Sequence, residues 1–280
     1  RFHPGEQDNQ MEFSSKLARH GQIYINDAFG TAHRAHASNS AILKYFKVKS
    51  FGLLMMKEFK YLTNEDLINN CVLIVGGAKI SSKLKLITNF LNKSSHILIG
   101  GAMAFTFLKA QNINIGNSLY EPDMIDQAKK ILKLADKSST EILLPLDVVT
   151  AKSIDDENDI NVSNFEQITK NDIGLDIGPE TTLNFDLILE NAKIIIWNGP
   201  LGMFEKLNFA TGTQAICDSI KRKSTNDNSI SIVGGGDTVR AAEHFTNLSA
   251  FTHVSSGGGA SLKLLSGEKL EILKSWEKYE

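Results

Sequence analysis

The stretch Ser229–Thr238 reads SISIVGGGDT and decides the fold. Its apolar run, Ser229–Val233, stops abruptly at three glycines and an aspartate, and a helical pattern follows at Val239–Phe245. Continuous apolar runs, as opposed to alternating ones, are typical of strands that are covered on both faces in parallel sheets. The stretch therefore predicts one strand–loop–helix unit of an α/β fold.

The same unit recurs along the 280 residues. The other expected strands are Gln22–Ile25, Val72–Val75, His96–Ile99, Ile142–Val149, Lys193–Trp197 and Phe251–Val254. The other expected helices of the repeating unit are Lys83–Leu91, Ala102–Ala110, Met124–Ala135, Leu183–Asn191 and Phe209–Lys221. Alternation of strands and helices predicts βαβ units and a doubly wound parallel sheet. A further helix at Leu53–Tyr61 marks a break after a short first segment.

Composition excludes several classes of partner. The chain is 42% hydrophobic and 22% charged, which is ordinary for a globular protein. Its net charge of −2 gives no broad positive field, so we expect neither nucleic-acid nor membrane-surface binding. No apolar run is long enough to predict a membrane span. The first residues of the sequence are polar and do not predict a signal peptide. Cys71 and Cys217 lack CxxC spacing, which predicts buried, reduced thiols in a cytoplasmic protein.

Most expected strands end in glycine, asparagine or aspartate. These ends are Gly76-Gly77, Gly100-Gly101, Asp147, Asn198-Gly199-Pro200, Gly234–Gly236 and Gly257–Gly259. Ligands of open α/β sheets bind at the carboxyl ends of the strands, and glycine lets backbone N–H groups approach a ligand closely. One such loop is equally well explained as a tight turn. Several on one sheet indicate a phosphate-binding edge.

The GGGDT segment places Gly234, Gly235 and Gly236 before Asp237 and Thr238 at the start of an expected helix. Exposed N–H groups and the helix dipole favour an anion there. Asp237 is then a helix N-cap, or a ligand of a magnesium ion that bridges phosphate oxygens, or both.

Three other segments offer charged groups or N–H donors. Lys79 and Lys83 lie four residues apart on one helical face, so they are either solvated or bind an anion. Glu205 is either a surface residue or an acceptor for a ribose diol. The triglycine Gly257–Gly259 is either a flexible loop or a nest of N–H groups around a phosphoryl group in transfer.

Basic side chains cluster near the start of the chain, where Thr31–His36 reads TAHRAH. His33, Arg34 and His36 form a basic pocket for a phosphorylated or carboxylated small substrate, a plain surface cluster, or part of a metal site. Arg34 between the two histidines favours an anion over a metal.

Known catalytic signatures narrow the chemistry. The chain has no Walker A loop, and the absence of GxGxxG argues against an NAD-dependent dehydrogenase. It also has no usable Ser/His/Asp or Cys/His arrangement. Phosphoryl transfer is compatible with the glycine-rich loops and charged residues that are present, because positioning and charge catalyse that reaction without covalent chemistry.

Eight stretches, in order and over nearly the whole chain, resemble phosphoglycerate kinases. They are Asn26–Ala37 (NDAFGTAHRAHA), Gly76–Leu84 (GGAKISSKL), Gly100–Ala110 (GGAMAFTFLKA), Leu144–Val149 (LPLDVV), Gly174–Thr181 (GLDIGPET), Trp197–Glu205 (WNGPLGMFE), Gly234–Thr238 (GGGDT) and His253–Leu265 (HVSSGGGASLKLL).

The resemblance implies two α/β lobes joined by a helical hinge. We expect a partial amino-terminal substrate lobe at 1–52, a hinge helix at 53–62 and a Rossmann-like nucleotide lobe at 63–280. The implied reaction is reversible phosphoryl transfer between 1,3-bisphosphoglycerate and ADP, giving 3-phosphoglycerate and ATP. It also implies Mg²⁺ bound with the nucleotide, and a monomeric, cytoplasmic enzyme of glycolysis.

The resemblance also assigns roles to residues. Catalytic roles fall on Lys79, Gly257, Gly258 and Gly259. Substrate-binding roles fall on Arg1, His33, Arg34 and His36. Nucleotide-binding roles fall on Gly77, Lys83, Gly101, Gly178, Asn198, Pro200, Glu205, Gly234, Gly235, Gly236, Asp237 and Thr238, and Asp237 is in addition the implied magnesium ligand.

The family pattern extends upstream of Arg1 by roughly a hundred residues, about the length of one domain. These residues carry further substrate-binding groups and an arginine for the transferring phosphoryl group. We therefore expect the chain as given to bind Mg-ADP and to transfer little or no phosphoryl group by itself. The alternative is a non-catalytic nucleotide-binding module, a fragmentary or decayed relative.

Overall fold

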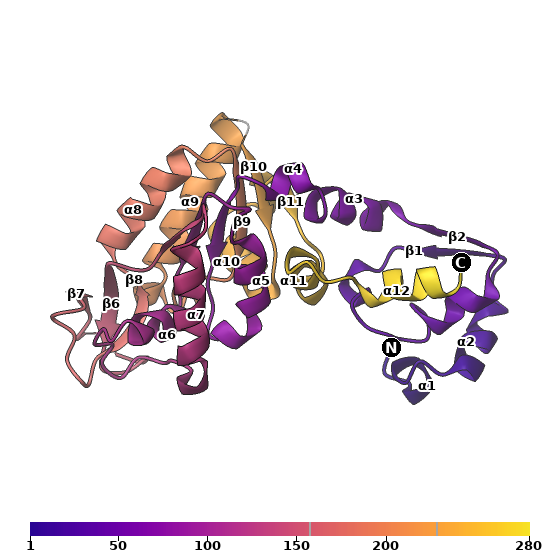
Figure 1. Cartoon of the computed structure of the whole chain (residues 1–280), viewed down its shortest axis with the longest axis horizontal. Helices are drawn as coiled ribbons and strands as arrows, with labels where there is room; N and C mark the ends of the chain where they lie inside the picture. The colour runs from indigo at the N-terminus through magenta and orange to yellow at the C-terminus, as the bar shows by residue number, and fades with distance from the viewer. Residues whose placement is uncertain (157, 228) are drawn as a thin grey trace. The chain divides into compact units, whose positions relative to one another are not determined.

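The computed structural model describes residues 1–156, 158–227 and 229–280. Contacts within the chain define two compact units. The colour bar of Figure 1 gives the residue number along the ribbon, from which the residues of each unit can be found. The first unit combines Arg1–Asn64 with Ser255–Glu280, and the second is Glu65–Val254.

A six-stranded parallel sheet forms the centre of the second unit, in the order β11-β10-β9-β3-β4-β5. The strands are β3 (Val72–Val75), β4 (His96–Ile99), β5 (Glu141–Leu143), β9 (Ile194–Asn198), β10 (Ile230–Val233) and β11 (His253–Val254). All four residues of β3 are buried, which explains its continuous apolar sequence. The predicted α/β class and parallel sheet are confirmed.

Helices connect these strands. They are α4 (Glu65–Ile68), α5 (Leu84–Phe90), α6 (Met103–Ala110), α7 (Ile125–Ala135), α8 (Pro179–Glu190), α9 (Thr211–Asn226) and α10 (Gly236–Phe245), with short 3-10 turns η3 (Ile80–Ser82), η4 (Pro122–Met124), η5 (Leu207–Phe209) and η6 (Leu248–Ala250). Trp197 of β9, Phe185 of α8 and Ile216 of α9 are fully buried in one core cluster. Burial of such side chains stabilises the fold by roughly 1.5–3 kcal/mol each, so α8 and α9 are packed firmly on the sheet.

The expected strand Ile142–Val149 is wrong as a single element. It consists of β5 and of β6 (Asp147–Ala151), and the two strands belong to different sheets. Pro145 lies between them and has no N–H group to continue a sheet ladder. Strand β6 pairs antiparallel with β7 (Asn161–Asn164) and β8 (Ile173–Ile177).

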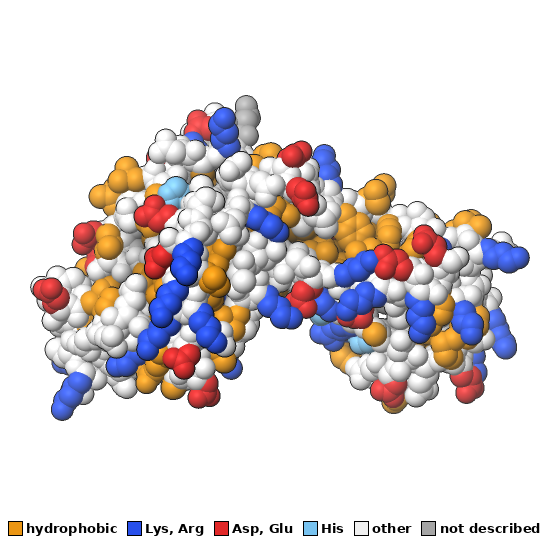
Figure 2. Space-filling model, viewed as in Figure 1, with side chains coloured by type: hydrophobic (Ala, Val, Ile, Leu, Met, Phe, Trp, Pro, Cys, Tyr) orange, Lys and Arg blue, Asp and Glu red, His pale blue; other side chains and the backbone are white. Residues whose placement is uncertain are grey.

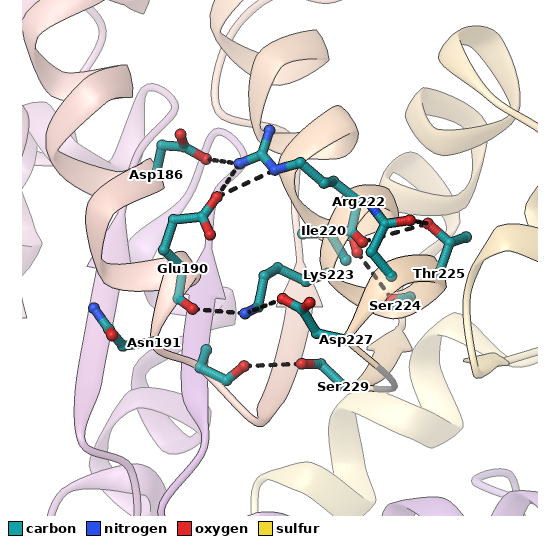
Figure 3. A network of polar contacts seen from close by, with 12 residues as sticks. Asp186, Glu190, Asn191, Ile220, Arg222, Lys223, Ser224, Thr225, Asp227 and Ser229 are labelled. Carbon is teal, nitrogen blue, oxygen red and sulfur yellow. Dashed lines mark hydrogen bonds and ion pairs between the residues drawn. The ribbon is translucent and has the colours of Figure 1, made fainter.

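A polar network ties α9 to α8 (Figure 3). Arg222 donates to Asp186 at 2.7 Å and to Glu190 at 2.5 Å. The buried Lys223 donates to the backbone carbonyl of Glu190 and to the Asp227 carboxylate, both at 2.6 Å. The carboxyl-terminal half of α9 is therefore held by side chains as well as by its apolar face.

The first unit contains a two-stranded parallel sheet of β1 (Ile23–Asn26) and β2 (Val48–Phe51). Its helices and 3-10 turns are α1 (Pro4–Gln7), α2 (Met11–Ala18), α3 (Leu53–Leu62), η1 (Phe29–Thr31), η2 (Ala41–Tyr45), α11 (Gly258–Leu265) and α12 (Glu271–Lys278).

The division of contacts differs in two respects from the expected lobes 1–52, 53–62 and 63–280. Residues 53–64, which include the expected hinge helix, belong to the first unit. The carboxyl-terminal segment Ser255–Glu280 packs in the first unit, although it follows the last strand of the second.

Polar and aromatic contacts explain this packing of the carboxyl-terminal segment. Ser256 donates to the buried Glu58 carboxylate of α3 through both its backbone N–H and its hydroxyl, each at 2.7 Å. Further along, the Trp276 ring of α12 stacks on Phe51 of β2, with ring centroids 4.3 Å apart. Ser256 thus binds the chain to the first unit directly after β11, and Trp276 binds it again in α12.

The distribution of surface charge and the state of the two cysteines can be compared with what the composition predicted. Lysine and arginine side chains are interspersed with acidic ones on the face that Figure 2 shows. Within the described ranges no helix is both long and apolar enough to cross a membrane. Cys71 and Cys217 are free and buried, and burial raises the pKa of each thiol to about 12.

Candidate active site

Loops that follow β3, β4 and β9 bond directly to one another. The Gly77 N–H donates to the Pro200 carbonyl at 2.8 Å, and the Gly101 N–H donates to the Leu201 carbonyl at 2.9 Å. A Cβ atom on Gly101 would lie 2.6 Å from the Gly77 nitrogen. Glycine at 101 is therefore required for packing between loops, whereas a Cβ on Gly77 would meet nothing within 4 Å.

A cavity of about 410 Å³ lies beside these loops. Its walls are largely apolar, and its polar edge includes Glu205, Asp237 and Arg240. The apolar lining includes Phe105, Leu119, Val148, Ile173, Leu175, Ile177, Met203 and Phe204. Such a slot suits a flat apolar group such as a nucleobase. Of the predicted residues, Gly77, Gly101, Pro200, Glu205 and Asp237 line it.

The amino terminus of α10 borders the cavity through Asp237. Its N-cap is Gly235, at φ 99°, and no side chain caps the helix. The first N–H groups of a helix have no intrahelical partners and favour an anion. A Cβ on Gly236 would meet nothing within 4 Å, so the approach to these N–H groups is open. Thr238 has a structural role, because its hydroxyl oxygen accepts a hydrogen bond from the Gly199 N–H at 2.6 Å.

The partly buried Lys83 and the buried Asn198 form a pair next to this helix end. The Lys83 ammonium donates to the Asn198 side-chain oxygen. Asn198 is fully buried, and its Nδ2 has no partner among the residues that the structure describes. Burial lowers the pKa of Lys83 to about 8, against the opposing charge of Asp237. A buried donor without a partner costs roughly 1–3 kcal/mol, so both groups favour an added acceptor.

Asp237 is the second residue of α10 and makes no capping hydrogen bond, so its interpretation as a helix N-cap is wrong. Its carboxylate instead pairs with Arg240 at 2.5 Å, and both side chains are exposed. No group of three or more His, Cys, Asp or Glu side chains suited to a metal occurs among the described residues.

Lys79 and Gly178 lie outside the cavity lining. Lys79 is exposed and precedes η3, whose Ser81 donates to Glu121 through its N–H at 3.0 Å and its hydroxyl at 2.6 Å. A Cβ on Gly178 would lie 2.2 Å from the Asp147 carboxyl carbon. Packing against Asp147 is therefore sufficient to explain the glycine.

The first unit brings the triglycine together with the TAHRAH segment. A Cβ on Gly259 would lie 2.9 Å from His33 Nε2, and one on Gly257 would lie 2.7 Å from the Phe29 ring. Arg34 Nε donates to His33 Nε2 at 3.3 Å, which leaves the proton on His33 Nδ1. That buried nitrogen has no partner within the described part of the chain. Burial, then the charge of Arg34, lowers the pKa of His33.

The remaining predicted substrate residues have different surroundings. His36 is buried, with its Nδ1 3.9 Å from Glu6 Oε1. Arg1 is exposed, and its guanidinium lies 5.6 Å from the centroid of the Phe2 ring.

Sequence reasoning missed the apolar lining of the cavity and the carboxylate in its wall, Asp176. In the sequence, Phe105, Leu119 and Leu175 are indistinguishable from core residues. The GLDIGPET motif includes Leu175 and Asp176, so the resemblance was the one signal that pointed to them.

An apolar cavity, an open helix N-terminus and a partly buried lysine at the carboxyl ends of parallel strands are the features of an α/β protein whose site suits a nucleoside phosphate. The family model described as phosphoglycerate kinase matches residues 1–268. The chain belongs to the phosphoglycerate kinase family, as its motifs predicted, and the members of this family are kinases.

Named relatives agree with the family model. The chain is 45% identical over 279 residues to the phosphoglycerate kinase of Pseudothermotoga lettingae, covering 98% of this chain and 69% of the relative. It is 44% identical to that of Chloroherpeton thalassium, covering 96% and 68%. The solved phosphoglycerate kinase of Coxiella burnetii matches with a TM-score of 0.90 at 37% identity, covering 99% of this chain and 71% of that one. Nothing in these matches favours a non-catalytic relative.

Proposed function

We propose that this chain carries the nucleotide site and part of the phosphoglycerate site of a phosphoglycerate kinase. The reaction is reversible phosphoryl transfer between 1,3-bisphosphoglycerate and ADP, giving 3-phosphoglycerate and ATP. The observation that carries the proposal is the uncapped N-terminus of α10 beside Lys83 and Asn198, at the edge of an apolar cavity.

The nucleotide needs all of these parts together. Micromolar binding requires about −8 kcal/mol, and one charge-assisted hydrogen bond contributes roughly 1.5–3 kcal/mol. The base enters the apolar slot, and Glu205 at its edge accepts from the ribose hydroxyls. The diphosphate lies against the N–H groups of Gly235–Thr238, where Lys83 and the unpartnered Asn198 amide can reach it.

The acceptor side belongs to the first unit. The buried Nδ1–H of His33 and the cations of Arg1 and Arg34 suit a phosphate or a carboxylate, and the buried His36 lies beside Glu6. Within this unit, the N–H groups of Gly257–Gly259 at the start of α11 are the proposed donors to the transferring phosphoryl group. In the second unit, Lys79 is the proposed cation for the same charge. Phosphoryl transfer needs no covalent group from the protein, so positioning and charge are sufficient.

Magnesium fits this chain through one carboxylate. Asp237 is exposed at the cavity edge, and oxygen ligands from one or two carboxylates plus substrate phosphates are the usual magnesium set. When bound, the ion neutralises phosphate charge. We also propose a monomer in the cytoplasm, which gel filtration and fractionation of cells test.

Calorimetric titration of ADP with and without Mg²⁺ tests the proposal. Native protein binds both forms, and Asp237→Ala weakens Mg-ADP far more than metal-free ADP. Arg240→Gln is the matched control, because it removes the same ion pair and leaves the carboxylate. Equal losses for the two ligands in Asp237→Ala would exclude the metal role. Absence of binding heat and of a thermal shift at millimolar Mg-ADP would exclude the nucleotide site.

A further inference from the structure

A buried carboxylate lies in the wall of the proposed nucleotide cavity and contacts no cation among the described residues. Asp176, near the end of β8, is 4% exposed. Its Oδ2 accepts from the Gly212 N–H at 2.7 Å, its Oδ1 accepts from the Ile177 N–H at 2.9 Å, and the Thr213 N–H also bonds to it. Burial raises the pKa of this carboxyl group to about 7, and the three N–H donors oppose that rise by favouring the charged form.

Two of these donors belong to the first turn of α9. The N-cap residue of that helix, Ala210, provides no side-chain cap. Asp176 therefore supplies from a neighbouring strand the acceptor that a capping side chain would normally provide. The carboxylate also complements the positive end of the α9 dipole. One residue thus fixes where the amino terminus of α9 lies against the end of β8.

Thr213 transmits this position to the loop that follows β9. Its buried hydroxyl oxygen accepts from the Leu201 N–H at 3.1 Å and from the Gly202 N–H at 3.0 Å. A Cβ on Gly202 would lie only 2.0 Å from Asp176 Oδ1, so the loop lies directly on the carboxylate. The Met203 N–H donates to the Leu175 carbonyl at 2.8 Å and holds the loop to β8 as well.

This loop forms part of the cavity wall. Its residues 200–205 all line the cavity and include the proposed ribose acceptor Glu205. The same loop accepts the N–H groups of Gly77 and Gly101 from two other loops. Any displacement of residues 199–205 therefore changes the shape of the base slot and the place of Glu205 together.

We propose that Asp176 and Thr213 are positioning residues for the nucleotide: Asp176 fixes the first turn of α9, and Thr213 holds the cavity-forming loop 199–205 in register with it. The inference rests on the proposed nucleotide site. It assigns to α9 a role in the site in addition to its role in the core. The helix is held at both ends, by Asp176 at its start and by the Arg222 and Lys223 network near its end.

The chain offers a matched control for a buried aspartate at a helix start. Asp147 is also 4% exposed, and its carboxylate accepts from the Glu180 N–H at 3.0 Å and the Thr181 N–H at 2.8 Å in the first turn of α8. Asp147 is absent from the cavity lining. Asp147→Asn therefore perturbs a similar cap without touching the loop 199–205.

The experiment compares Thr213→Val, Thr213→Ser, Asp176→Asn and Asp147→Asn with the native chain by calorimetry with Mg-ADP. Loss of hydrogen bonds to a buried group predicts about tenfold or greater weakening of ADP binding in Thr213→Val and Asp176→Asn. Thr213→Ser keeps the hydroxyl and stays within about twofold of native. Asp147→Asn lowers the melting temperature and leaves ADP affinity unchanged.

Hydrogen exchange of residues 199–205 gives a second readout that needs no ligand. Faster exchange of the Leu201 and Gly202 amides in Thr213→Val shows that Thr213 holds the loop, whether or not the native chain binds ADP. Failure of the nucleotide site and failure of the positioning contact are therefore distinguished. Native-like ADP affinity and native-like exchange in Thr213→Val would overturn the inference. So would equal loss of ADP affinity in Asp176→Asn and Asp147→Asn.

Discussion

Binding of ADP should be accompanied by proton uptake at alkaline pH, and Lys83 should be the group that becomes protonated. Burial lowers the pKa of Lys83 to about 8 in the free protein. A diphosphate beside the ammonium favours the charged form, so the pKa rises on binding. At pH 9 about one in ten free Lys83 side chains is protonated, so binding takes up at most about 0.9 proton. Below pH 7 the uptake vanishes, because Lys83 is already charged.

The sign of the pH dependence follows from the same linkage. ADP affinity falls as pH rises above about 8, by up to tenfold per pH unit until the pKa of the complex is reached. The nucleotide itself adds little, since phosphate has its last pKa near 6. Stability behaves oppositely: Lys83 binds fewer protons in the folded chain than in the unfolded one, so its contribution to stability rises between about pH 8 and the unfolded pKa.

Calorimetry of ADP binding at pH 9, in two buffers with different ionisation enthalpies, measures this proton number. Lys83→Met removes the uptake and weakens ADP binding at pH 7 by roughly 10–150-fold, the equivalent of one charge-assisted hydrogen bond of 1.5–3 kcal/mol. Equal proton uptake in native protein and Lys83→Met would refute the assignment, as would an enthalpy that does not depend on the buffer for the native protein.

Two other substitutions separate ligand binding from stability. Gly236→Val places a side chain in the open space before α10, so it weakens ADP binding by about tenfold or more and costs roughly 1 kcal/mol of stability or less. Calorimetry and thermal melting measure the two effects, and unchanged ADP affinity would show that the phosphates bind elsewhere. Lys223→Met leaves the Glu190 carbonyl without its buried donor and costs about 2–3 kcal/mol of unfolding free energy, while ADP affinity stays native. Since roughly 2–4 °C of melting temperature is expected per kcal/mol, a melting temperature within about 1 °C of native would contradict this prediction.

Much of the fold could be predicted because its strands are short and buried on both faces. The runs Val72–Val75 and His96–Ile99 are strands with the predicted bounds. The prediction failed where apolar character continued across a proline, at β5 and β6. It also missed β8, whose GLDI sequence is interrupted by glycine and aspartate. Asp176 lines the cavity and bonds to the start of α9. The hydrophobicity pattern of a single segment cannot reveal such long-range contacts.

The candidate site was predicted less completely, for a physical reason. Charged and glycine residues at strand ends point to phosphate chemistry from the sequence, so Lys83, Gly236 and Asp237 could be predicted as candidates. The base slot depends on apolar residues from distant segments, such as Phe105 and Leu119, and nothing local marks them. The position of Gly257–Gly259 in the first unit depends on Ser256 bonding to Glu58, nearly two hundred residues earlier in the chain.

A crystal structure of the chain with Mg-ADP tests the central claim most directly. The account predicts the adenine in the slot between Phe105, Leu119 and Leu175, with the diphosphate at the N–H groups of Gly235–Thr238 and within hydrogen-bond distance of Lys83. A diphosphate bound away from the start of α10, with the Asn198 amide still without a partner, would contradict it.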